Sequence, residues 1–351
     1  MTERRPFVRV PVDTGEQMRQ KIIDLGILDK EHRIISEDRY LYIPLVRYTE
    51  AIESQLDSDD IEFGERAFES TVEGPRSLEE ALEDKLSVKE LGYLPRAYDL
   101  IGDIAVLEIP DEIRDHAEAI GQAFHEIHPN FSTVLAKHGA IGGTRRVREY
   151  EHLHGEDKTH TIHTEYGFRI AVDLAKAYFS PRLLQEHHRI AQQVEDGEVV
   201  VDMFTGVGPF AIHIAGSSES TVYAIDINPD AIALLEESIS MNRLKGEIIP
   251  VVADASEYVP CNFNHNVDRI IMNHPSGAAE FVADACTAIH KGGMLHYYDF
   301  LGGENPESSV EHKIRQLVGG AGRRVSQVRN VRRVRDSAPY EYQLVTDVVV
   351  H

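Results

Sequence analysis

The sequence predicts an α/β protein in which a domain with a central, mostly parallel sheet follows two smaller α+β domains. From residue 177 onward, short and continuously apolar strands alternate with helical patterns, which is typical of a parallel sheet covered by helices on both faces. Before residue 177, strands and helices fall into two groups that an acidic stretch separates. With 351 residues, of which 42% are hydrophobic, the chain is long enough for two or three domains with ordinary cores.

Residues 1–70 predict a small N-terminal α+β domain. The strand "FVRVPV" precedes the helix "TGEQMRQKIIDLGIL", which begins at Thr14 and ends near Gly26, and two further strands are "RYLYIPLV" and "IEFGERAFE". Residues 71–85 are acidic and weakly apolar, and Gly74 with the proline after it interrupts them. This composition predicts a linker at 71–85.

Residues 86–176 predict a middle α+β domain. The strand pair "YDLIGDIAVLEIP" is followed by a helix that Pro110 opens. Four further strands are "TVLAKHG", "RRVREYEHLHG", "THTIHTEYG" and "FRIAVDLAKAYF". Polar and apolar side chains alternate in them, which indicates strands with one solvated face.

Residues 177–351 predict the domain with the parallel sheet. Its first helix is "SPRLLQEHHRIAQQV", and the strand "EVVVDMF" leads into the helix "PFAIHIAGS". The strand "TVYAID", the helix "NPDAIALLEESISMNRL" and the strands "IIPVVAD" and "VDRIIMN" follow. The helix "SGAAEFVADACTAIH" and the strand "GMLHYYDF" complete the series.

The formal net charge of −23 is unusual for a protein that binds nucleic acid, because lysines and arginines normally neutralise phosphates. Acids spread over every segment, with more arginine than lysine, are typical of a salt-adapted protein; an acidic protein with a small-molecule substrate is the alternative. Basic residues nevertheless cluster at Arg145, Arg146 and Arg148, and six arginines lie within 323–335. We expect these arginines to contact phosphate. For 323–335 the alternative is an edge strand with solvated arginines.

The sequence predicts a cytoplasmic protein. No apolar segment follows Met1, and no apolar run approaches the roughly 20 residues of a membrane span. Cys261 and Cys286 are too few for a disulfide framework or a zinc site with several cysteines. A reducing compartment fits this cysteine content.

Four histidines in the predicted middle domain raise the question of a metal site: His152, His154, His160 and His163. They alternate along predicted strands, without partner cysteines and without a helical pair four residues apart. We therefore expect no metal.

The stretch "VVVDMFTGVGPFAIHIA" predicts a nucleotide-type site at the end of a buried strand. Asp202 ends the strand, and Gly206 and Gly208 form a tight turn before a helix, so that the backbone can approach a ligand closely. Asp226 lies 24 positions beyond Asp202, where its carboxylate can accept hydrogen bonds from both ribose hydroxyls. A dinucleotide dehydrogenase would share these elements, with Ala211 in place of the third glycine.

Two further strand ends favour another cofactor. Asp254 ends the third strand, where an acid can meet an adenine amino group, and Asn273 and Pro275 end the fourth. This order resembles the Rossmann-like class I methyltransferases, and it implies S-adenosylmethionine as cofactor. Ser276 stands where enzymes that methylate exocyclic amines carry an aromatic residue. With Pro275 fixing the turn, we expect Asn273 to hold a base extruded from its stack, although an Asn that merely ends a strand is the plainer alternative.

Longer strings identify a family. The strings "AKAYFSPRLLQEHHRI", "DMFTGVGPFAI", "YAIDINPDAI" and "MNHPSGAAEF" resemble the archaeal and eukaryotic tRNA (guanine-N1)-methyltransferases that act on guanosine 37, next to the anticodon. The resemblance covers nearly the whole chain: "FVRVP", "LGILDK" and "YLYIPL" are similar to the family's small N-terminal domain, which contacts the tRNA elbow. His274 departs from the family pattern, in which an apolar residue is commoner.

The resemblance implies roles for individual residues. Glu186 matches the general base, Arg146 the arginine that contacts the guanine oxygen, and Asn273 the Asn of the catalytic loop. Three arginines are expected to contact the substrate: Arg145, Arg148 and Arg182. The positions expected to bind the cofactor are Tyr178, His187, Phe204, Gly206, Gly208, Asp226, Ile227, Asp254, Ala255, Asn273 and Pro275.

These residue types suit methylation at N1 of guanine. N1 carries a proton at neutral pH, so a carboxylate within hydrogen-bond reach must take it. Charge then grows on O6, where a guanidinium stabilises it, and alignment of the two partners supplies much of the remaining rate. A solvated acid near a helix start and a surface arginine are the plainer interpretations of Glu186 and Arg146.

Three other functions stay open. The related wybutosine-pathway enzyme transfers the aminocarboxypropyl group of the same cofactor; the N-terminal domain and Asn273 favour methyl transfer instead. A bifunctional enzyme would also methylate a tricyclic guanosine derivative. A cofactor-sensing RNA-binding protein would bind without turnover, and the presence of both Glu186 and Arg146 argues against it. We expect tRNA as the partner, contacted at the anticodon loop and the elbow, a monomeric enzyme, and neither membrane nor metal.

Overall fold

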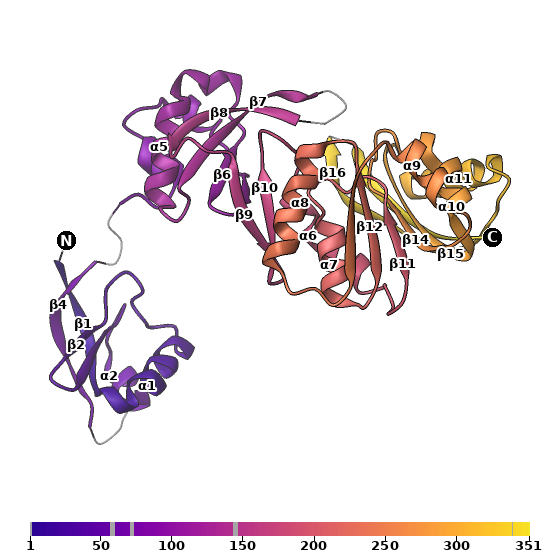
Figure 1. Cartoon of the computed structure of the whole chain (residues 1–351). Coiled ribbons are helices and arrows are strands. Elements are labelled where there is room, and N and C mark those ends of the chain that lie inside the picture. The colour runs from indigo at the N-terminus through magenta and orange to yellow at the C-terminus, as the bar shows by residue number, and fades with distance from the viewer. Residues whose placement is uncertain (1, 57–59, 71–73, 143–146, 339) are drawn as a thin grey trace. The chain divides into compact units, whose positions relative to one another are not determined.

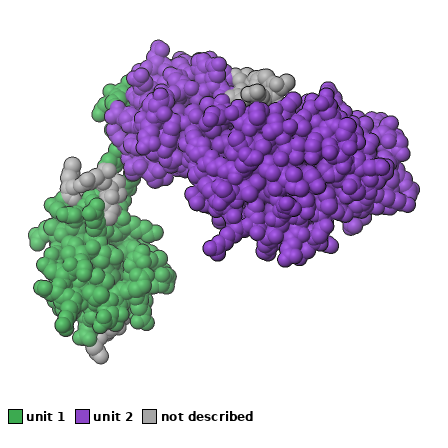
Figure 2. Space-filling model, viewed as in Figure 1, with its two compact units in different colours: residues 1–85 green, residues 86–351 purple. Residues whose placement is uncertain are grey.

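The computed structural model describes residues 2–56, 60–70, 74–142, 147–338 and 340–351. The chain forms two compact units, residues 1–85 and residues 86–351 (Figure 2). No helix in the described part of the chain has the length and apolar character that crossing a membrane requires.

The first unit is a four-stranded antiparallel sheet with helices. Its strand order is β2-β3-β1-β4, so the first strand of the chain lies inside the sheet. The core that the helices and the sheet share includes Val8, Val10, Ile22, Ile43 and Leu45. The predicted helix and three predicted strands of residues 1–70 are confirmed. The elements are β1 Thr2–Pro11, α1 Val12–Asp24, β2 Ile35–Glu37, β3 Tyr40–Pro44, α2 Glu50–Leu56 and β4 Glu62–Glu69.

The predicted linker at 71–85 contains a short helix, α3 Leu78–Leu82. The Ser77 side chain accepts a hydrogen bond from the backbone N–H of Glu80 and so caps the helix start. Leu78 and Leu82 are buried. A segment with few apolar residues can therefore still be ordered, because the two that it has lie on one helix face.

The second unit begins with a four-stranded sheet in the order β5-β6-β7-β8. Helix α5 packs against this sheet through an apolar face that includes Ile120 and Phe124. The predicted helix after Pro110 is divided into a 3-10 helix and α5. The elements are α4 Val88–Leu91, β5 Asp99–Ile101, β6 Ile104–Leu107, η1 Asp111–His116, α5 Ala117–Ile127, β7 Thr133–Gly142 and β8 Val147–Gly155.

A seven-stranded sheet forms the larger part of this unit, in the order β13-β12-β11-β14-β15-β17-β16. Figure 1 labels five of these strands, β11, β12, β14, β15 and β16. The first five strands of that order run parallel, β17 runs antiparallel to them, and the edge strand β16 pairs antiparallel with β17. The mostly parallel sheet is thus confirmed. Its strands are β11 Val199–Asp202, β12 Thr221–Asp226, β13 Glu247–Val252, β14 Val267–Met272, β15 Ile289–Gly302, β16 Val325–Ala338 and β17 Glu341–Val350.

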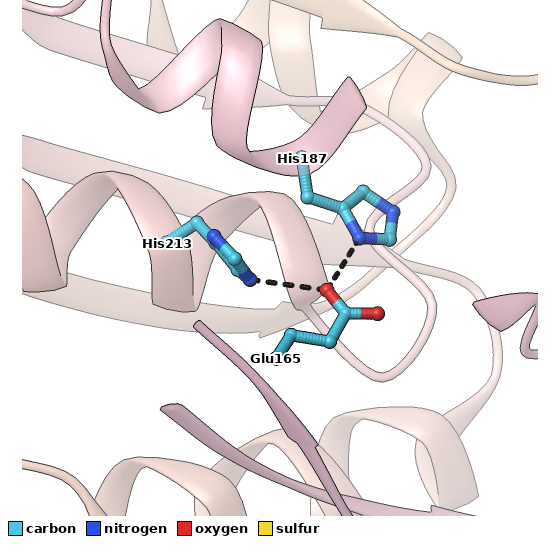
Figure 3. Close-up of side chains that lie close together, drawn as sticks. All are labelled: Glu165, His187 and His213. Carbon is cyan, nitrogen blue, oxygen red and sulfur yellow. Dashed lines mark hydrogen bonds and ion pairs between the residues drawn. The ribbon is translucent and has the colours of Figure 1, made fainter. Parts of the chain in front are cut away.

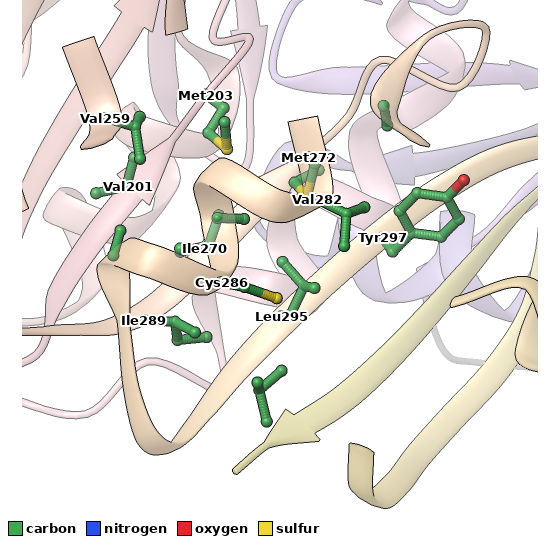
Figure 4. Packing of buried hydrophobic residues seen from close by; sticks show 14 of the residues in the cluster. Val201, Met203, Val259, Ile270, Met272, Val282, Cys286, Ile289, Leu295 and Tyr297 are labelled. Carbon is green, nitrogen blue, oxygen red and sulfur yellow. The ribbon is translucent and has the colours of Figure 1, made fainter. Parts of the chain in front are cut away.

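Helices cover both faces of the seven-stranded sheet. Neighbouring residues of a strand point to opposite faces, so each strand contributes to both cores. Ile270 packs in one core and Ile271 in the other. Figure 4 shows the first core, where α9, α10 and α11 pack on the sheet; α6, α7 and α8 pack on the other face. The helices are η2 Pro181–Leu183, α6 Leu184–Ala191, α7 Pro209–Ser217, α8 Pro229–Met241, α9 Ala255–Asn262, η3 Ala278–Phe281, α10 Val282–Ala288 and α11 Pro306–Gly320.

The hairpin of β9 His160–Glu165 and β10 Phe168–Asp173 lies against helix α8. The backbone N–H of Ala171 donates to the Ser238 hydroxyl over 2.9 Å. The sequence predicts this hairpin as part of the middle domain, yet it packs on a helix that covers the large sheet. The predicted division between residues 176 and 177 falls inside one compact unit.

Candidate active site

A cavity of about 320 Å³ opens at the carboxyl ends of the parallel strands. Ligands in open α/β sheets bind there, where the strand order reverses, and in this sheet the reversal lies between β11 and β14. The cavity walls come from the segments that follow four parallel strands, from the segment before α6, and from β16 and β17. These segments are 203–207, 226–228, 253–255, 273–275 and 177–180.

The turn from β11 into α7 needs its glycines. Gly206 and Gly208 have φ of 55° and 80°, which favours glycine. A Cβ on Gly208 would also lie 2.2 Å from the Leu235 side chain. Gly206 lines the cavity, whereas Gly208 supports the turn and is not among the lining residues that the structure describes.

Asp226 is placed at the cavity by two backbone hydrogen bonds. Its carboxylate accepts from the N–H of Gly206 over 2.8 Å and from the N–H of Asn228 over 2.9 Å. Burial raises its pKa above the usual value. A carboxylate held in this way at the end of β12 can accept further hydrogen bonds from a ribose, as the sequence predicts.

The next strand end carries Asp254, which caps helix α9. Its side chain accepts from the backbone N–H of Ser256 over 2.9 Å. Asp254 and Ala255 both line the cavity, together with Ile227, whose surface is 50% exposed. The edge of the cavity at β12 and β13 therefore offers carboxylates beside apolar surface, which suits a nucleoside.

The Asn-x-Pro loop closes another side of the cavity. Asn273 and Pro275 are lining residues, and Oδ1 of Asn273 accepts from Nε2 of Gln343 over 3.1 Å. The Phe204 ring lies 5.0 Å from the His274 ring, measured between centroids. His274 therefore packs on an aromatic residue of the β11 turn.

Sequence reasoning missed two residues of the C-terminal strand pair. Arg335 on β16 donates to the Tyr178 hydroxyl over 3.1 Å and to Oε1 of Gln343 over 2.7 Å. All three side chains line the cavity. The arginine run of 323–335 was a signal for Arg335, although the contact made here is with the cavity wall. Gln343 carried no signal, because its strand joins the sheet only through long-range pairing.

His187 belongs to a buried cluster with Glu165 and His213 (Figure 3). One carboxylate oxygen of Glu165 pairs with Nδ1 of His187 over 2.8 Å and with Nε2 of His213 over 3.0 Å. Burial alone would raise the pKa of Glu165, but hydrogen bonds from the two imidazoles lower it to about 2. His187 also lines the cavity, so Glu165 fixes one side chain of the cavity wall.

The same three side chains have the composition of a metal site. Two imidazoles and a carboxylate form a ligand set that Zn²⁺ accepts, and their ligand atoms lie within 4.8 Å of one another. The hydrogen bonds already give both imidazoles a partner. These are not the four histidines that the sequence offers as possible metal ligands. One of those four, His163, lies near the cluster, with its Nε2 3.8 Å from Oε1 of Glu165.

Glu186, the predicted general base, lies on α6 between two lining residues, Leu183 and His187. Its side chain is 1% exposed, and it is not among the described residues that line the cavity. Burial alone would raise the pKa of Glu186, but Arg189, Tyr298 and Arg332 together lower it. Glu186 is therefore an ionised carboxylate surrounded by donors.

Of the predicted substrate arginines, the two that the structure describes, Arg148 and Arg182, do not line the cavity. Arg145 and Arg146 are outside the described residues. Arg148 is half-buried on β8, and Arg182 donates from Nε to Asp99 over 2.7 Å. The structure thus brings ten predicted residues to the cavity: Tyr178, His187, Phe204, Gly206, Asp226, Ile227, Asp254, Ala255, Asn273 and Pro275.

Three domain families match consecutive parts of the chain. Residues 8–53 match the tRNA methyltransferase 5 N-terminal domain, and residues 78–159 match the TYW2 N-terminal domain. Residues 161–326 match the TRM5/TYW2 methyltransferase domain. The last match begins at β9, so it includes the hairpin that packs on α8.

Similar proteins extend over the whole chain. The tRNA (guanine(37)-N(1))-methyltransferase Trm5b of Pyrococcus abyssi is 38% identical over 97% of this chain and 97% of its own length. Its crystal structure covers 99% of both chains with a TM-score of 0.73. A complex of aTrm5 with tRNALeu is 34% identical, with a TM-score of 0.72 over 98% of this chain and 99% of that one.

A more distant relative is named for a different activity. The tRNA(Phe) (4-demethylwyosine(37)-C(7)) aminocarboxypropyltransferase of Pyrococcus horikoshii is 31% identical over 63% of this chain and 78% of its own length. The likeness to Trm5b is both higher and longer. The chain belongs to the TRM5/TYW2 methyltransferase family, together with the tRNA (guanine(37)-N(1))-methyltransferases.

Proposed function

We propose that this protein transfers the methyl group of S-adenosylmethionine to N1 of guanosine 37 in tRNA. The observation that carries the proposal is likeness over the full length to an enzyme named for this reaction. The match of residues 8–53 to the N-terminal domain of that enzyme type supports it further. An enzyme for a small molecule would not need such a domain.

The residues that line the cavity suit S-adenosylmethionine. The glycine turn lets the backbone approach a ligand, and Asp226 and Asp254 supply acceptors at neighbouring strand ends. A volume of about 320 Å³ lies within the range of ligand pockets. We propose that Asp226 binds the ribose hydroxyls, that Asp254 faces the adenine, and that His187 borders the amino-acid end. The bound cofactor supplies an electrophilic methyl group on a sulfonium.

We further propose that Glu186 removes the N1 proton of guanine. The cations around Glu186 keep it ionised, so it can accept a proton. In the free protein Oε1 of Glu186 already accepts hydrogen bonds from Arg189 and Tyr298, and Oε2 accepts from Arg189 and Arg332, which fills the usual four acceptor sites of a carboxylate. The guanine N1–H must therefore replace one of the present donors. Arg332 is the one of these donors that is 37% exposed and lies on the edge strand, so it is the one to be displaced.

Arg146 is proposed to stabilise the charge that grows on O6, and Asn273 to hold the extruded base. Asn273 lies at the cavity, and Gln343 restrains its amide. The remaining arginines, Arg145, Arg148 and Arg182, are proposed to contact the tRNA. Two of these five residues, Arg145 and Arg146, lie outside the described part of the chain.

The test uses labelled S-adenosylmethionine and two tRNA transcripts, with guanosine or adenosine at position 37, in high salt. We expect label in the guanosine transcript alone and 1-methylguanosine after digestion. Label in both transcripts would refute the position. A product heavier by an aminocarboxypropyl group would establish the rival transferase, and cofactor binding without turnover would establish a binding protein.

A further inference from the structure

The guanidinium of Arg189 lies between two buried carboxylates. Its Nε and Nη2 donate to the two oxygens of Glu186, over 2.9 and 2.7 Å. Its Nη1 donates to Oδ2 of Asp347 over 2.6 Å. Glu186 and Asp347 are each 1% exposed. A planar guanidinium held on both edges cannot rotate without breaking one of these contacts.

Asp347 is itself held from β15. Nδ1 of His296 contacts Oδ1 of Asp347 over 2.6 Å, and Nε2 of His296 contacts Nη1 of Arg269 over 2.8 Å. Because a guanidinium can only donate, Nε2 accepts and Nδ1 carries the proton that it donates to Asp347. Arg269 in turn pairs with Glu198 over 2.8 Å. The contacts therefore run from β14 through β15 and β17 to Arg189 on α6, which contacts Glu186.

Stability alone does not explain this chain of buried contacts. Buried ion pairs contribute little net stability, because removing the charges from water costs as much as their attraction returns. They do restrain orientation. The bidentate contact of Arg189 fixes the plane of the Glu186 carboxylate, and the contact of Asp347 fixes the plane of Arg189.

We propose that Asp347 is a positioning residue for the methyl transfer: it anchors Arg189, and through Arg189 it orients Glu186 toward N1 of the base. The inference rests on the proposed function and on Glu186 as its base. Asp347 also favours proton transfer to Glu186 in a second way. It shares the positive charge of Arg189, and without it that charge would act on Glu186 alone and weaken it as a proton acceptor.

The first experiment measures Asp347→Asn under single-turnover conditions with saturating tRNA and cofactor. We expect the rate to fall about tenfold, the usual scale for a group that orients a reacting residue, with the cofactor dissociation constant within about twofold. Asp299→Asn is the matched control. It removes a buried carboxylate of β15 that contacts Tyr297 and Lys313 and not Arg189. We expect the control to keep the wild-type rate.

A double-mutant cycle separates positioning from general loss of structure. In a Glu186→Gln background, Asp347→Asn should lower the remaining rate by less than about twofold, because no base is left to orient. An equal fall in both backgrounds, or Asp347→Asn at the wild-type rate, overturns the proposal. If Asp347→Asn loses cofactor binding, Arg189→Lys takes its place in the same cycle. A lysine keeps the charge but cannot hold both carboxylates in one plane.

The proposed function and the positioning role of Asp347 would be refuted by different results. If the wild-type protein makes no 1-methylguanosine, the proposed function is wrong. If the wild type makes it and the cycle shows no coupling between Asp347 and Glu186, the function stands and the positioning role is wrong.

Discussion

Gln343 on β17 donates from Nε2 to Oδ1 of Asn273, 3.1 Å away. This hydrogen bond connects the strand next to the sheet edge with the loop after β14. The same side chain accepts from Arg335 over 2.7 Å. Gln343 is 1% exposed. A buried amide with both ends paired can exist in one orientation, and it transmits that orientation to Asn273.

Gln343→Leu should therefore slow methyl transfer about tenfold while the fold is kept, because leucine has similar volume and no amide to hold Asn273. Single-turnover rates with tRNA measure this. Gln327→Leu makes the same change at an exposed position of the neighbouring strand and should have no effect. A wild-type rate for Gln343→Leu would show that the loop is held without it.

Asp226→Ala should raise the dissociation constant of S-adenosylmethionine at least about tenfold, since acceptance of two ribose hydroxyls by a partly buried carboxylate is worth roughly 1.5–3 kcal/mol. Titration calorimetry measures it directly. Glu236→Ala, an exposed acid on α8, controls for the loss of one negative charge. Unchanged affinity in Asp226→Ala would move the ribose contact to another residue.

Glu186→Gln should lower the single-turnover rate by about 10²–10⁴, the span expected for a lost general base, and leave cofactor binding unchanged. The lowered pKa of Glu186 places its ionisation in the free enzyme below the ordinary 4.5. The pH dependence of kcat/KM reports the free enzyme, so Glu186 should cause no fall between pH 8 and 6. A near-wild-type rate for Glu186→Gln would mean that the proton leaves by another route.

Asp202 gives a pH dependence of stability. Burial raises its pKa from 3.8 to about 7. Between these values the folded protein keeps a proton that the unfolded chain has lost, so the free energy of unfolding falls as pH rises from about 4 to 7 and then stays low. The full effect is on the order of 4 kcal/mol.

Asp202→Asn removes that ionisation. The free energy of unfolding of the variant minus that of the wild type should therefore be larger at pH 8 than at pH 5. Urea unfolding without cofactor at the two pH values measures the gain, and Asp230→Asn on α8 is a control for loss of a carboxylate on a less buried residue. An equal difference between variant and wild type at both pH values would place the titration elsewhere.

The parallel strands and their ligand-facing ends could be predicted because both depend on local signals. Buried parallel strands are continuous apolar runs, and every residue that follows one must face the same edge of the sheet. Asp226, Asp254 and Asn273 were placed in this way, and all three line one cavity. The glycine turn was predictable for the same reason, since positive φ leaves its mark in the residue type.

Contacts between distant segments left no such mark. Arg335 and Gln343 reach the cavity through the pairing of β16 and β17, which local periodicity does not determine. Glu165 meets His187 because a hairpin assigned to the middle domain packs on the helices of the large sheet. The helix inside the predicted linker was missed because two buried leucines are too few to change the composition of an acidic stretch.

The contact of Glu165 with His187 and His213 also limits how the protein can be divided for laboratory use. A fragment that starts at residue 177 would keep both imidazoles and lose the carboxylate that they share. Two buried rings would then face each other without an acceptor, beside the cavity. The smallest fragment that keeps this cluster therefore begins before β9, and experiments that exchange the upstream parts of the chain should join them before residue 160.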